Sequence, residues 1–566
     1  MRADNFREEV VSFIASNAPL KKEDIEPILE KPKSLELGDL AFPCFILAKH
    51  LKNSPQNIAS ELKLKFGRSD IILKVESVGP YLNFFASKEK MAESVLVRIK
   101  KQNKKYGLSD KKGEKVMIEY CSPNTNKALH LGHVRNIVLG SSVAKIRAFD
   151  GYDVVTSSLN NDRGVGVCEA MLGYMMFHKG EKPKIKPDHF VAQCYVDFKK
   201  AAEKDPSLND KVKALLLEWE AGKRDVIALW KKILEWVYDG YYETYKLLGV
   251  KFDREYYESE IYTKGKEVVT RGLESGIFMK KDDAIVAPLE SHGLPDKVLL
   301  KSDGTALYIT QDIYLAERKF DDFKMDYSVY VVASEQDLHF RQLFKILELL
   351  GFSFAKNCYH LSYGMVNLPS GRMKSREGNV VDADTLITEV SAIAKEEIAK
   401  RHSDLSAKEL ESRSRAIALA AIKFFMVKID PVKDFVFNPE ESISFEGETG
   451  PYLQYAHARC CSLLKKYKKK VKTNIDFSKF EKTENLISKL AEFNSVVEDA
   501  SKHYKPSVVA LYLLSLVQEF STFYNDNQII SDDKKLTEYR ILLVECIKQV
   551  LENGLDLLGI EAIDEM

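Results

Sequence analysis

The chain has 566 residues, which exceeds the ~100 to 200 residues of a usual domain and predicts at least three domains. Hydrophobic residues make up 45% of the chain and charged residues 30%, and no run approaches the ~20 apolar residues of a membrane-spanning helix, so we expect no membrane insertion. Lysine plus arginine equals aspartate plus glutamate, at 84 each, so the net charge does not point to a polyanionic partner.

Residues 1–105 predict a small N-terminal α+β domain that ends in a linker. Amphipathic helical patterns surround one strand-like run, Tyr81–Phe85, and the polar stretch 100–105 follows. The first residues mix charges of both signs and lack the apolar segment of a signal peptide. We therefore expect a cytoplasmic protein.

Residues 106–384 predict a Rossmann-type catalytic domain built on a parallel sheet. The apolar-rich run Val116–Tyr120 leads through a Pro/Asn loop into a helix from about His133, which is how nucleotide-binding α/β domains usually open. A second strand-like run lies at 327–332, and charged helical patterns at about 185–290 predict a connective insertion between the two runs.

The remaining chain reads as helical. We expect a helical connection at 385–434 and an all-α domain at 435–566, which gives a multidomain α/β fold class. The eight cysteines are scattered, without a C-x-x-C pair or histidines at zinc-ligand spacing, so we expect free thiols and no structural zinc.

The loop after the first strand carries the first candidate motif, which runs from Ser122 to His133. His130 and His133 stand three apart at a helix start, so both can face one ligand. The unpaired N–H groups of a helix start favour an anion such as phosphate. Gly132 has no side chain, so a flat adenine could lie against the backbone between the histidines.

A basic, glycine-bounded loop at 371–379 is the second candidate motif. Such a loop can close over a triphosphate and neutralise the charge that moves to pyrophosphate as it leaves. Alone, either motif has a plain structural explanation, because a histidine near a helix start often packs locally and a basic loop is usually solvated surface.

Together and in this order, the two motifs resemble the HIGH and KMSKS signatures of class I aminoacyl-tRNA synthetases. Within that class the chain is most similar to arginyl-tRNA synthetases, and the resemblance runs over nearly the whole length. Besides the two motifs it rests on the segments Leu37–Ala41, Val78–Phe84, Glu448–Arg459 and Asn553–Ile560.

The resemblance implies a set of catalytic and ATP-binding residues. The catalytic set comprises Lys127, His130, His133, Lys374 and Arg376, and the ATP-binding set comprises His130, Gly132, His133, Met373, Lys374 and Ser375.

The second motif departs from the family signature in its lysines. Arg372 stands where the signature has its first lysine, and Ser375 stands at the later lysine position. Arginyl enzymes with such a degenerate motif carry a lysine just ahead of the first motif, so we interpret Lys127 as the substitute cation, helped by Lys374 and Arg376. The alternative is that Lys127 is loop surface.

A pocket for arginine should supply carboxylates and polar acceptors, because a guanidinium is planar, rich in donors and always charged. The resemblance implies six arginine-binding residues, namely Glu119, Asn124, Glu258, Tyr308, Asp312 and Gln336. Of these we expect Glu258, Asp312 and Tyr308 at the guanidinium, with Asn124 and Gln336 at the α-amino end. Tyr308 and Asp312 are four apart, which would place both on one helix face. For each acid alone, a surface salt bridge or a helix cap is an open alternative.

RNA contacts are implied in both terminal domains. By resemblance, Asn83 would touch the tRNA elbow, and the helical C-terminal domain would read the anticodon loop with Tyr452, Tyr455 and Arg459. These last three residues could equally pack the helical domain.

The expected function is that of an arginyl-tRNA synthetase. ATP, with Mg²⁺ on its phosphates, would activate L-arginine to arginyl-adenylate, and the 3′ terminal ribose of tRNA(Arg) would accept the arginyl group. By resemblance, activation waits for bound tRNA. The alternatives are a class I synthetase for another amino acid and an inactive paralogue that binds tRNA. A monomer is expected.

Overall fold

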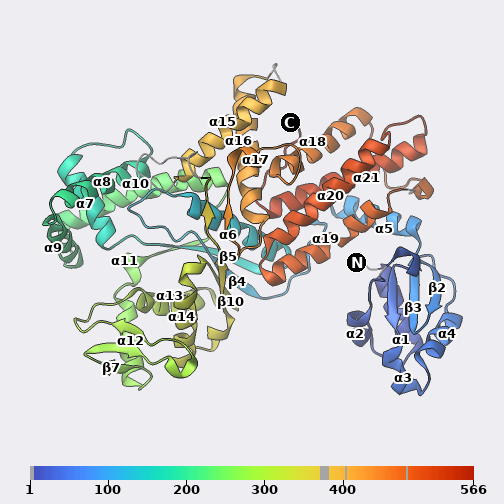
Figure 1. Cartoon of the computed structure of the whole chain (residues 1–566), viewed down its shortest axis with the longest axis horizontal. Helices are drawn as coiled ribbons and strands as arrows, with labels where there is room; N and C mark the ends of the chain where they lie inside the picture. The colour runs from blue at the N-terminus through green and yellow to red at the C-terminus, as the bar shows by residue number, and fades with distance from the viewer. Residues whose placement is uncertain (1–4, 33, 370–380, 402–404, 480–481) are drawn as a thin grey trace.

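The computed structural model describes residues 5–32, 34–369, 381–401, 405–479 and 482–566. It shows a small N-terminal domain, a central parallel sheet with two insertions, and a C-terminal group of long helices (Figure 1). The multidomain α/β class expected from the sequence is confirmed.

The N-terminal domain is a three-stranded antiparallel sheet, in the order β1-β3-β2, with helices packed against it. The strand expected around Tyr81–Phe85 is the central strand β3. The domain has its own core, in which Leu82 and Phe84 of β3 are fully buried. Its elements are α1 (Asn5–Asn17), α2 (Lys22–Ile25), β1 (Leu40–Pro43), α3 (Phe45–Leu51), α4 (Pro55–Lys65), β2 (Ile72–Val78) and β3 (Tyr81–Ala86).

Five parallel strands form the central sheet, in the order β11-β10-β4-β5-β6. The chain first winds outward from β4 to β5 and β6 and later returns to the other side as β10 and β11, so the switch point lies between β4 and β10. In open parallel sheets, ligands bind beyond the carboxyl ends of the strands at such a point. The strands are β4 (Lys115–Glu119), β5 (Asp153–Asn160), β6 (Arg254–Tyr257), β10 (Tyr327–Ala333) and β11 (Cys358–Tyr363).

Helix α6 (Leu131–Phe149) follows β4 and lies between the sheet and the C-terminal helices. It is buried along most of its length, including Arg135 and Arg147, because both of its faces are covered. Ser142 donates to the carbonyl of Leu557, which ties the helix to the C-terminal domain.

Two insertions interrupt the sheet, where the sequence predicted one at about 185–290. The first is helical and comprises α7 (Val165–Phe177), α8 (Pro187–Lys204), α9 (Leu208–Glu220) and α10 (Arg224–Leu248). The chain then returns to the sheet as β6. After α11 (Glu258–Ile261), the second insertion comprises α12 (Lys264–Glu274), β7 (Met279–Lys281), β8 (Ala284–Ala287) and β9 (Lys297–Leu300). A four-residue strand is too short for its periodicity to be recognised, which explains the difference.

The later part of the chain completes the central domain and forms the C-terminal helices (Figure 1). These elements are α13 (Tyr308–Phe323), α14 (Asp337–Leu349), β12 (Val366–Asn367), α15 (Ala383–Arg401), α16 (Ala407–Val427), β13 (Phe435–Val436), α17 (Pro439–Ser442), α18 (Gly450–Tyr467), α19 (Glu484–His503), α20 (Pro506–Asp526) and α21 (Lys534–Leu557). By length and composition, α20 alone among the described residues could cross a membrane, but just over half of it is buried against neighbouring helices, as in a core helix.

Helix α5 (Lys88–Gln102) joins the N-terminal domain to the rest of the chain and packs on α19 and α21. Its buried residues Val95, Leu96 and Ile99 belong to the same core as the sheet and the C-terminal helices. Part of the range 1–105, expected as N-terminal domain, therefore packs with the far end of the chain.

Candidate active site

The two motif histidines form the first turn of α6 at the carboxyl end of β4. His130 is the N-cap, and its Nδ1 accepts the N–H of Gly132 at 3.1 Å, while Nδ1 of His133 accepts the N–H of His130 at 3.1 Å. The two rings lie 3.9 Å apart between centroids. A Cβ on residue 132 would come within 3.0 Å of the His130 ring, so glycine leaves room for the ring in this position. The motif thus positions both imidazoles side by side.

Both imidazoles are neutral at physiological pH. Burial, followed by the neighbouring His130 and Lys127, lowers the pKa of His133 to about 3, and burial together with Lys127 also lowers the pKa of His130. Since each Nδ1 accepts a backbone N–H, the ring proton of each histidine resides on Nε2. Each ring therefore has an Nε2–H donor to offer a phosphate or sugar oxygen.

The backbone N–H groups at this helix start are less free than the sequence argument assumed. Leu131 donates its N–H to the carbonyl of Val381 at 3.0 Å, and Gly132 donates to His130. Ala383 also donates to the carbonyl of Leu129 at 2.8 Å. The imidazoles therefore replace some of the amides as donors, and the segment after the second motif is paired with the first. Of the predicted residues, Met373, Lys374, Ser375 and Arg376 lie outside the described residues.

Asn136 joins four elements at the switch point, a role the sequence analysis did not identify. Its Oδ1 accepts the N–H of Cys121 at 2.6 Å, and its Nδ2 donates to the carbonyl of Val331 and the hydroxyl of Tyr363 at 2.7 and 3.0 Å. Cys121 has a positive φ of 61°, which turns the chain sharply after β4. This side chain holds the ends of β4, β10 and β11 against α6.

Lys127 is exposed in the loop before α6. Its ammonium group lies 5.7 Å from the ring centroid of Tyr195 on α8, and its carbonyl accepts the hydroxyl of Tyr241 at 2.6 Å. The same hydroxyl donates to the carbonyl of Asn124 at 3.0 Å. The first insertion therefore holds this loop from outside, and the Lys127 charge is close enough to lower the pKa of both histidines.

Three residues predicted at the guanidinium lie near one another, beyond β6 and at the start of α13. Glu258 is 5% exposed and accepts from Nε2 of Gln311 at 3.2 Å. Burial raises the pKa of Glu258 to about 7, despite Gln311 and Arg163, and the charge of Asp312 contributes to the rise. Burial, followed by the charge of Glu258, raises the pKa of Tyr308. Around Glu258, two further carboxylates, Asp162 and Asp312, act against the one guanidinium of Arg163.

Asp312 and Tyr308 occupy one helix, as expected from their spacing. Asp312 contacts Nε2 of His339 on α14 at 2.7 Å, and Tyr308, at the first residue of α13, is 72% exposed. A large exposed aromatic beside two carboxylates is a suitable wall for a planar cation.

The other three predicted pocket residues differ in their surroundings. Glu119, at the end of β4, forms a buried ion pair with Lys319, which also lies over the Tyr330 ring. Its charge is thus already paired, and its contact with arginine stays a prediction. Asn124 is exposed in the loop after β4, and Gln336 is exposed at the end of the 3-10 helix Ser334–Gln336 after β10; β4 and β10 are neighbouring strands at the switch point.

Two further residues belong to this pocket that the sequence analysis missed. Asp162, beyond β5, accepts the N–H and hydroxyl of Ser259 at 2.8 and 2.6 Å, next to Glu258. Arg163 lies 3.9 Å from the Glu258 carboxylate and over the Tyr262 ring. The signal that could have found them is the strand-like run at 153–160, because polar residues after a parallel strand face the ligand edge.

The predicted RNA-contacting residues fall into two kinds. Tyr455 is exposed and lies against the Arg459 guanidinium, which also contacts the Tyr524 ring, whereas the Tyr452 hydroxyl bonds to Ser521 inside the helical domain. Asn83 is 3% exposed on β3. All four contacts stay predictions.

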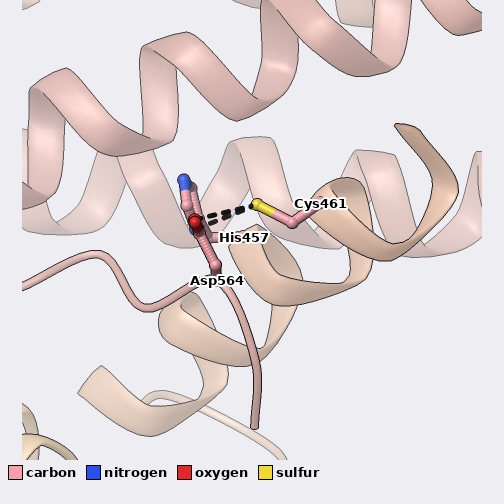
Figure 2. Close-up of side chains that lie close together, drawn as sticks. All are labelled: His457, Cys461 and Asp564. Carbon is pink, nitrogen blue, oxygen red and sulfur yellow. Dashed lines mark hydrogen bonds between the residues drawn. The ribbon is translucent and has the colours of Figure 1, made fainter. Parts of the chain in front are cut away.

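One cluster in the C-terminal domain brings together residue types that can bind metals (Figure 2). The Cys461 thiol donates to Asp564 at 3.3 Å, and Nδ1 of His457 lies 2.9 Å from the carbonyl of Ile563. Burial and Asp564 raise the pKa of Cys461 to about 12, so the thiol keeps its proton. Hydrogen bonds that fix the C-terminal tail on α18 account for this cluster.

The sheet order, the histidine turn at its switch point and the neighbouring acidic pocket define a class I aminoacyl-tRNA synthetase. Residues 94–439 match the family described as tRNA synthetases class I (R), catalytic domain. Residues 4–86 match the arginyl tRNA synthetase N terminal domain, and residues 453–566 match the DALR anticodon binding domain. The chain belongs to the arginyl-tRNA synthetase family.

Individual relatives agree along the whole chain. The chain is 42% identical to the arginine–tRNA ligase of Treponema denticola, over 95% of this chain and 94% of the relative. It is 40% identical to the arginine–tRNA ligase of Bacteroides fragilis, over 98% and 99%. The solved arginyl-tRNA synthetase of Thermus thermophilus superposes with a TM-score of 0.83 at 27% identity and full coverage of both chains.

Proposed function

We propose that this protein is an arginine–tRNA ligase, which activates L-arginine with ATP and transfers it to the 3′ terminal ribose of tRNA(Arg). The observation that carries the proposal is the pocket around buried Glu258, in which Asp162 and Asp312 outnumber Arg163, in a chain of this family. A positively charged ligand stabilises the ionised carboxylates of such a pocket, which burial disfavours.

ATP, as its magnesium complex, binds across the switch point in this proposal. The Nε2–H groups of His130 and His133 donate to the phosphates, and adenine lies against Gly132. Lys127, with Met373, Lys374, Ser375 and Arg376 of the second motif, neutralises the charge that moves to pyrophosphate. Catalysis then consists of positioning and charge stabilisation, without a covalent enzyme intermediate.

The substrate guanidinium pairs with the carboxylates of Glu258 and Asp312 against the Tyr308 ring. Asn124, Gln336 and Glu119 serve the α-amino and carboxylate end, where the polar residues after β4 and β10 gather. The α-carboxylate then attacks the α-phosphate of ATP, and a terminal ribose hydroxyl of the tRNA attacks the activated carbonyl.

The tRNA contacts both ends of the protein in this account. Tyr455 and Arg459 offer an exposed aromatic and a cation to unpaired anticodon-loop bases, which suits stacking recognition. Tyr452 bonds inside the helical domain and stabilises this face. Strand β3, which carries the buried Asn83, stabilises the surface that contacts the tRNA elbow. We propose that activation requires bound tRNA and that the protein acts as a cytoplasmic monomer.

Attachment of labelled amino acids to tRNA tests the proposal. Citrulline has nearly the shape of arginine but an uncharged urea in place of the guanidinium. The proposal predicts charging with arginine and a value of kcat/KM for citrulline lower by ~10⁴ or more, because buried acceptors would be left without their cation. Charging with a different amino acid, or binding of tRNA without any charging, would contradict it.

A further inference from the structure

A partly buried group of charges links the first insertion to the helix that follows the second motif. Nζ of Lys186 lies 2.7 Å from Asp384 at the start of α15, and Nε2 of His189 on α8 lies 2.9 Å from the same carboxylate. Lys186 also donates to Thr244 on α10. A lysine and a histidine of the insertion therefore converge on one carboxylate of α15.

Asp188 lies buried beside this group of charges. It is 1% exposed, neither carboxylate oxygen has a hydrogen-bond partner among the described residues, and its nearest cation is Lys186 at 3.5 Å. A Cβ at Gly240 would lie 2.1 Å from this carboxylate, so the backbone of α10 packs directly against the Asp188 side chain of α8. The hydrogen bond to Asp384 raises the pKa of His189, as expected for an ionic contact.

Asp384 directly follows the part of the chain that pairs with the histidine motif. Ala383 donates to the carbonyl of Leu129, and Val381 accepts the N–H of Leu131, so two backbone hydrogen bonds flank His130. Asp382, between them, caps α15 by accepting the N–H and hydroxyl of Thr385. A shift of the first turn of α15 would therefore move the backbone that holds His130.

The middle of helix α8 also lies against the first motif. Its Tyr195 ring lies under the ammonium group of Lys127, while Tyr241 of α10 holds the Lys127 carbonyl. The first insertion thus touches the motif loop directly and the motif backbone through Asp384.

We propose that Lys186, His189 and Asp384 are positioning residues for adenylate formation, which hold segment 381–384 against the first motif and thereby set the place of His130. They act through the backbone of Leu129 and Leu131 and do not contact substrate. The proposal rests on the proposed ligase function, since adenylate formation is the step they serve.

A matched contact within the insertion provides the control. Nε2 of His178 contacts Asp197 of the same helix α8, also at 2.9 Å and with similar exposure, but joins α7 to α8 away from the motif. We compare full-length His189→Ala and His178→Ala by arginine-dependent pyrophosphate exchange with saturating tRNA, and by thermal unfolding. His189→Gln, which keeps an N–H donor, covers the case in which His189→Ala fails to fold.

The expected result is a kcat lower by ~10-fold in His189→Ala, with the KM for arginine within ~2-fold of wild type and substantial recovery in His189→Gln. His178→Ala should keep kcat within ~2-fold while losing a similar amount of thermal stability. Equal kcat in the two alanine variants, or a loss in His189→Ala that appears only in the KM for arginine, would overturn the proposal. Absence of exchange in the wild type would instead refute the ligase function itself.

Discussion

The two carboxylates expected at the guanidinium differ in what faces them. Asp312 has His339 at 2.7 Å, whereas Glu258 has only the amide of Gln311 and, at 3.9 Å, the Arg163 guanidinium. Burial therefore dominates at Glu258 and raises its pKa to about 7 from an ordinary 4.5. Without its ligand, this residue is half protonated near neutral pH, and a bound guanidinium would draw the proton off.

Arginine binding should therefore depend on pH through Glu258. Below pH ~7 the carboxyl group must release a proton before it can pair with the cation, so the KM for arginine should rise, by up to ~10-fold per pH unit. Pyrophosphate exchange measured from pH 8 to 6 tests this. The motif histidines should not contribute, because the pKa of each is lowered.

The variant Glu258→Gln tests whether Glu258 causes the pH dependence of the KM for arginine. It should raise the KM for arginine at pH 8 and remove its pH dependence. The pKa of Glu258 is raised in the folded protein. As pH rises from 4.5 towards 7, the unfolded chain releases this proton more readily than the folded protein does, so the folded state loses stability. The variant lacks this carboxyl group and should therefore melt ~2 °C higher than the wild type at pH 8, but not at pH 4.5. A KM for arginine that stays flat with pH in the wild type would contradict this account.

At the scale of single residues, the sequence motifs selected side chains that the structure brings together, but they did not predict how those side chains pair. Glu258, Tyr308 and Asp312 were predicted from motifs, and the structure places them near one another. The Glu119–Lys319 ion pair was not foreseen, because it joins residues two hundred positions apart and only the fold brings strand β4 beside α13.

Among the elements, the turn from β4 into α6 depends on one side chain. Asn136 satisfies buried groups of three separate segments and does so with both its oxygen and its nitrogen. Substituting it leaves donors and acceptors buried without partners, which costs ~1 to 3 kcal/mol for each such group.

Asn136→Ala should lower the melting temperature by ~5 °C and the kcat of pyrophosphate exchange by ~10-fold. Asn553→Ala is the matched control, since Asn553 is also buried and its amide donates to the carbonyls of Asn103 and Tyr106 far from the switch point. That variant should lose stability and keep its kcat. Similar kcat values in the two variants would mean that Asn136 has no special part in shaping the site.

Elements with long, regular patterns were predictable, while short ones were not. Strands β4 and β10 lie at the two predicted strand-like runs, and helices α9 and α10 lie in the region of predicted helical patterns at about 185–290. Strand β6 is four residues long and all four of its side chains are polar or aromatic, so its place in the sheet depends on pairing with β5 rather than on a pattern of its own.

Across the whole molecule, α5 joins the first domain to the last. Tyr106, just beyond α5, donates to the carbonyl of Leu490 on α19, and Lys100 pairs with Glu545 on α21 at 2.5 Å. The N-terminal domain has its own separate core, so it can be removed without opening the main one.

A chain that begins at Ser87 should therefore melt within ~3 °C of the full-length protein. Its KM for tRNA should rise by ~10-fold or more, because the proposed elbow contact would be lost, while the KM for arginine at saturating tRNA stays within ~2-fold. Steady-state aminoacylation and thermal unfolding measure both effects. Loss of the folded state, or an unchanged KM for tRNA, would contradict this division of the molecule.

Pyrophosphate exchange with each amino acid in turn, with and without tRNA, tests the central claim most directly. It should be run on the wild type, on Lys127→Ala and on Lys182→Ala, an exposed lysine in the loop between α7 and α8. The account predicts exchange that requires arginine and tRNA, falls by ~10²-fold in Lys127→Ala and is unchanged in Lys182→Ala. Exchange with another amino acid, or none at all, would contradict the ligase function, and full activity in Lys127→Ala would show that this lysine is only loop surface.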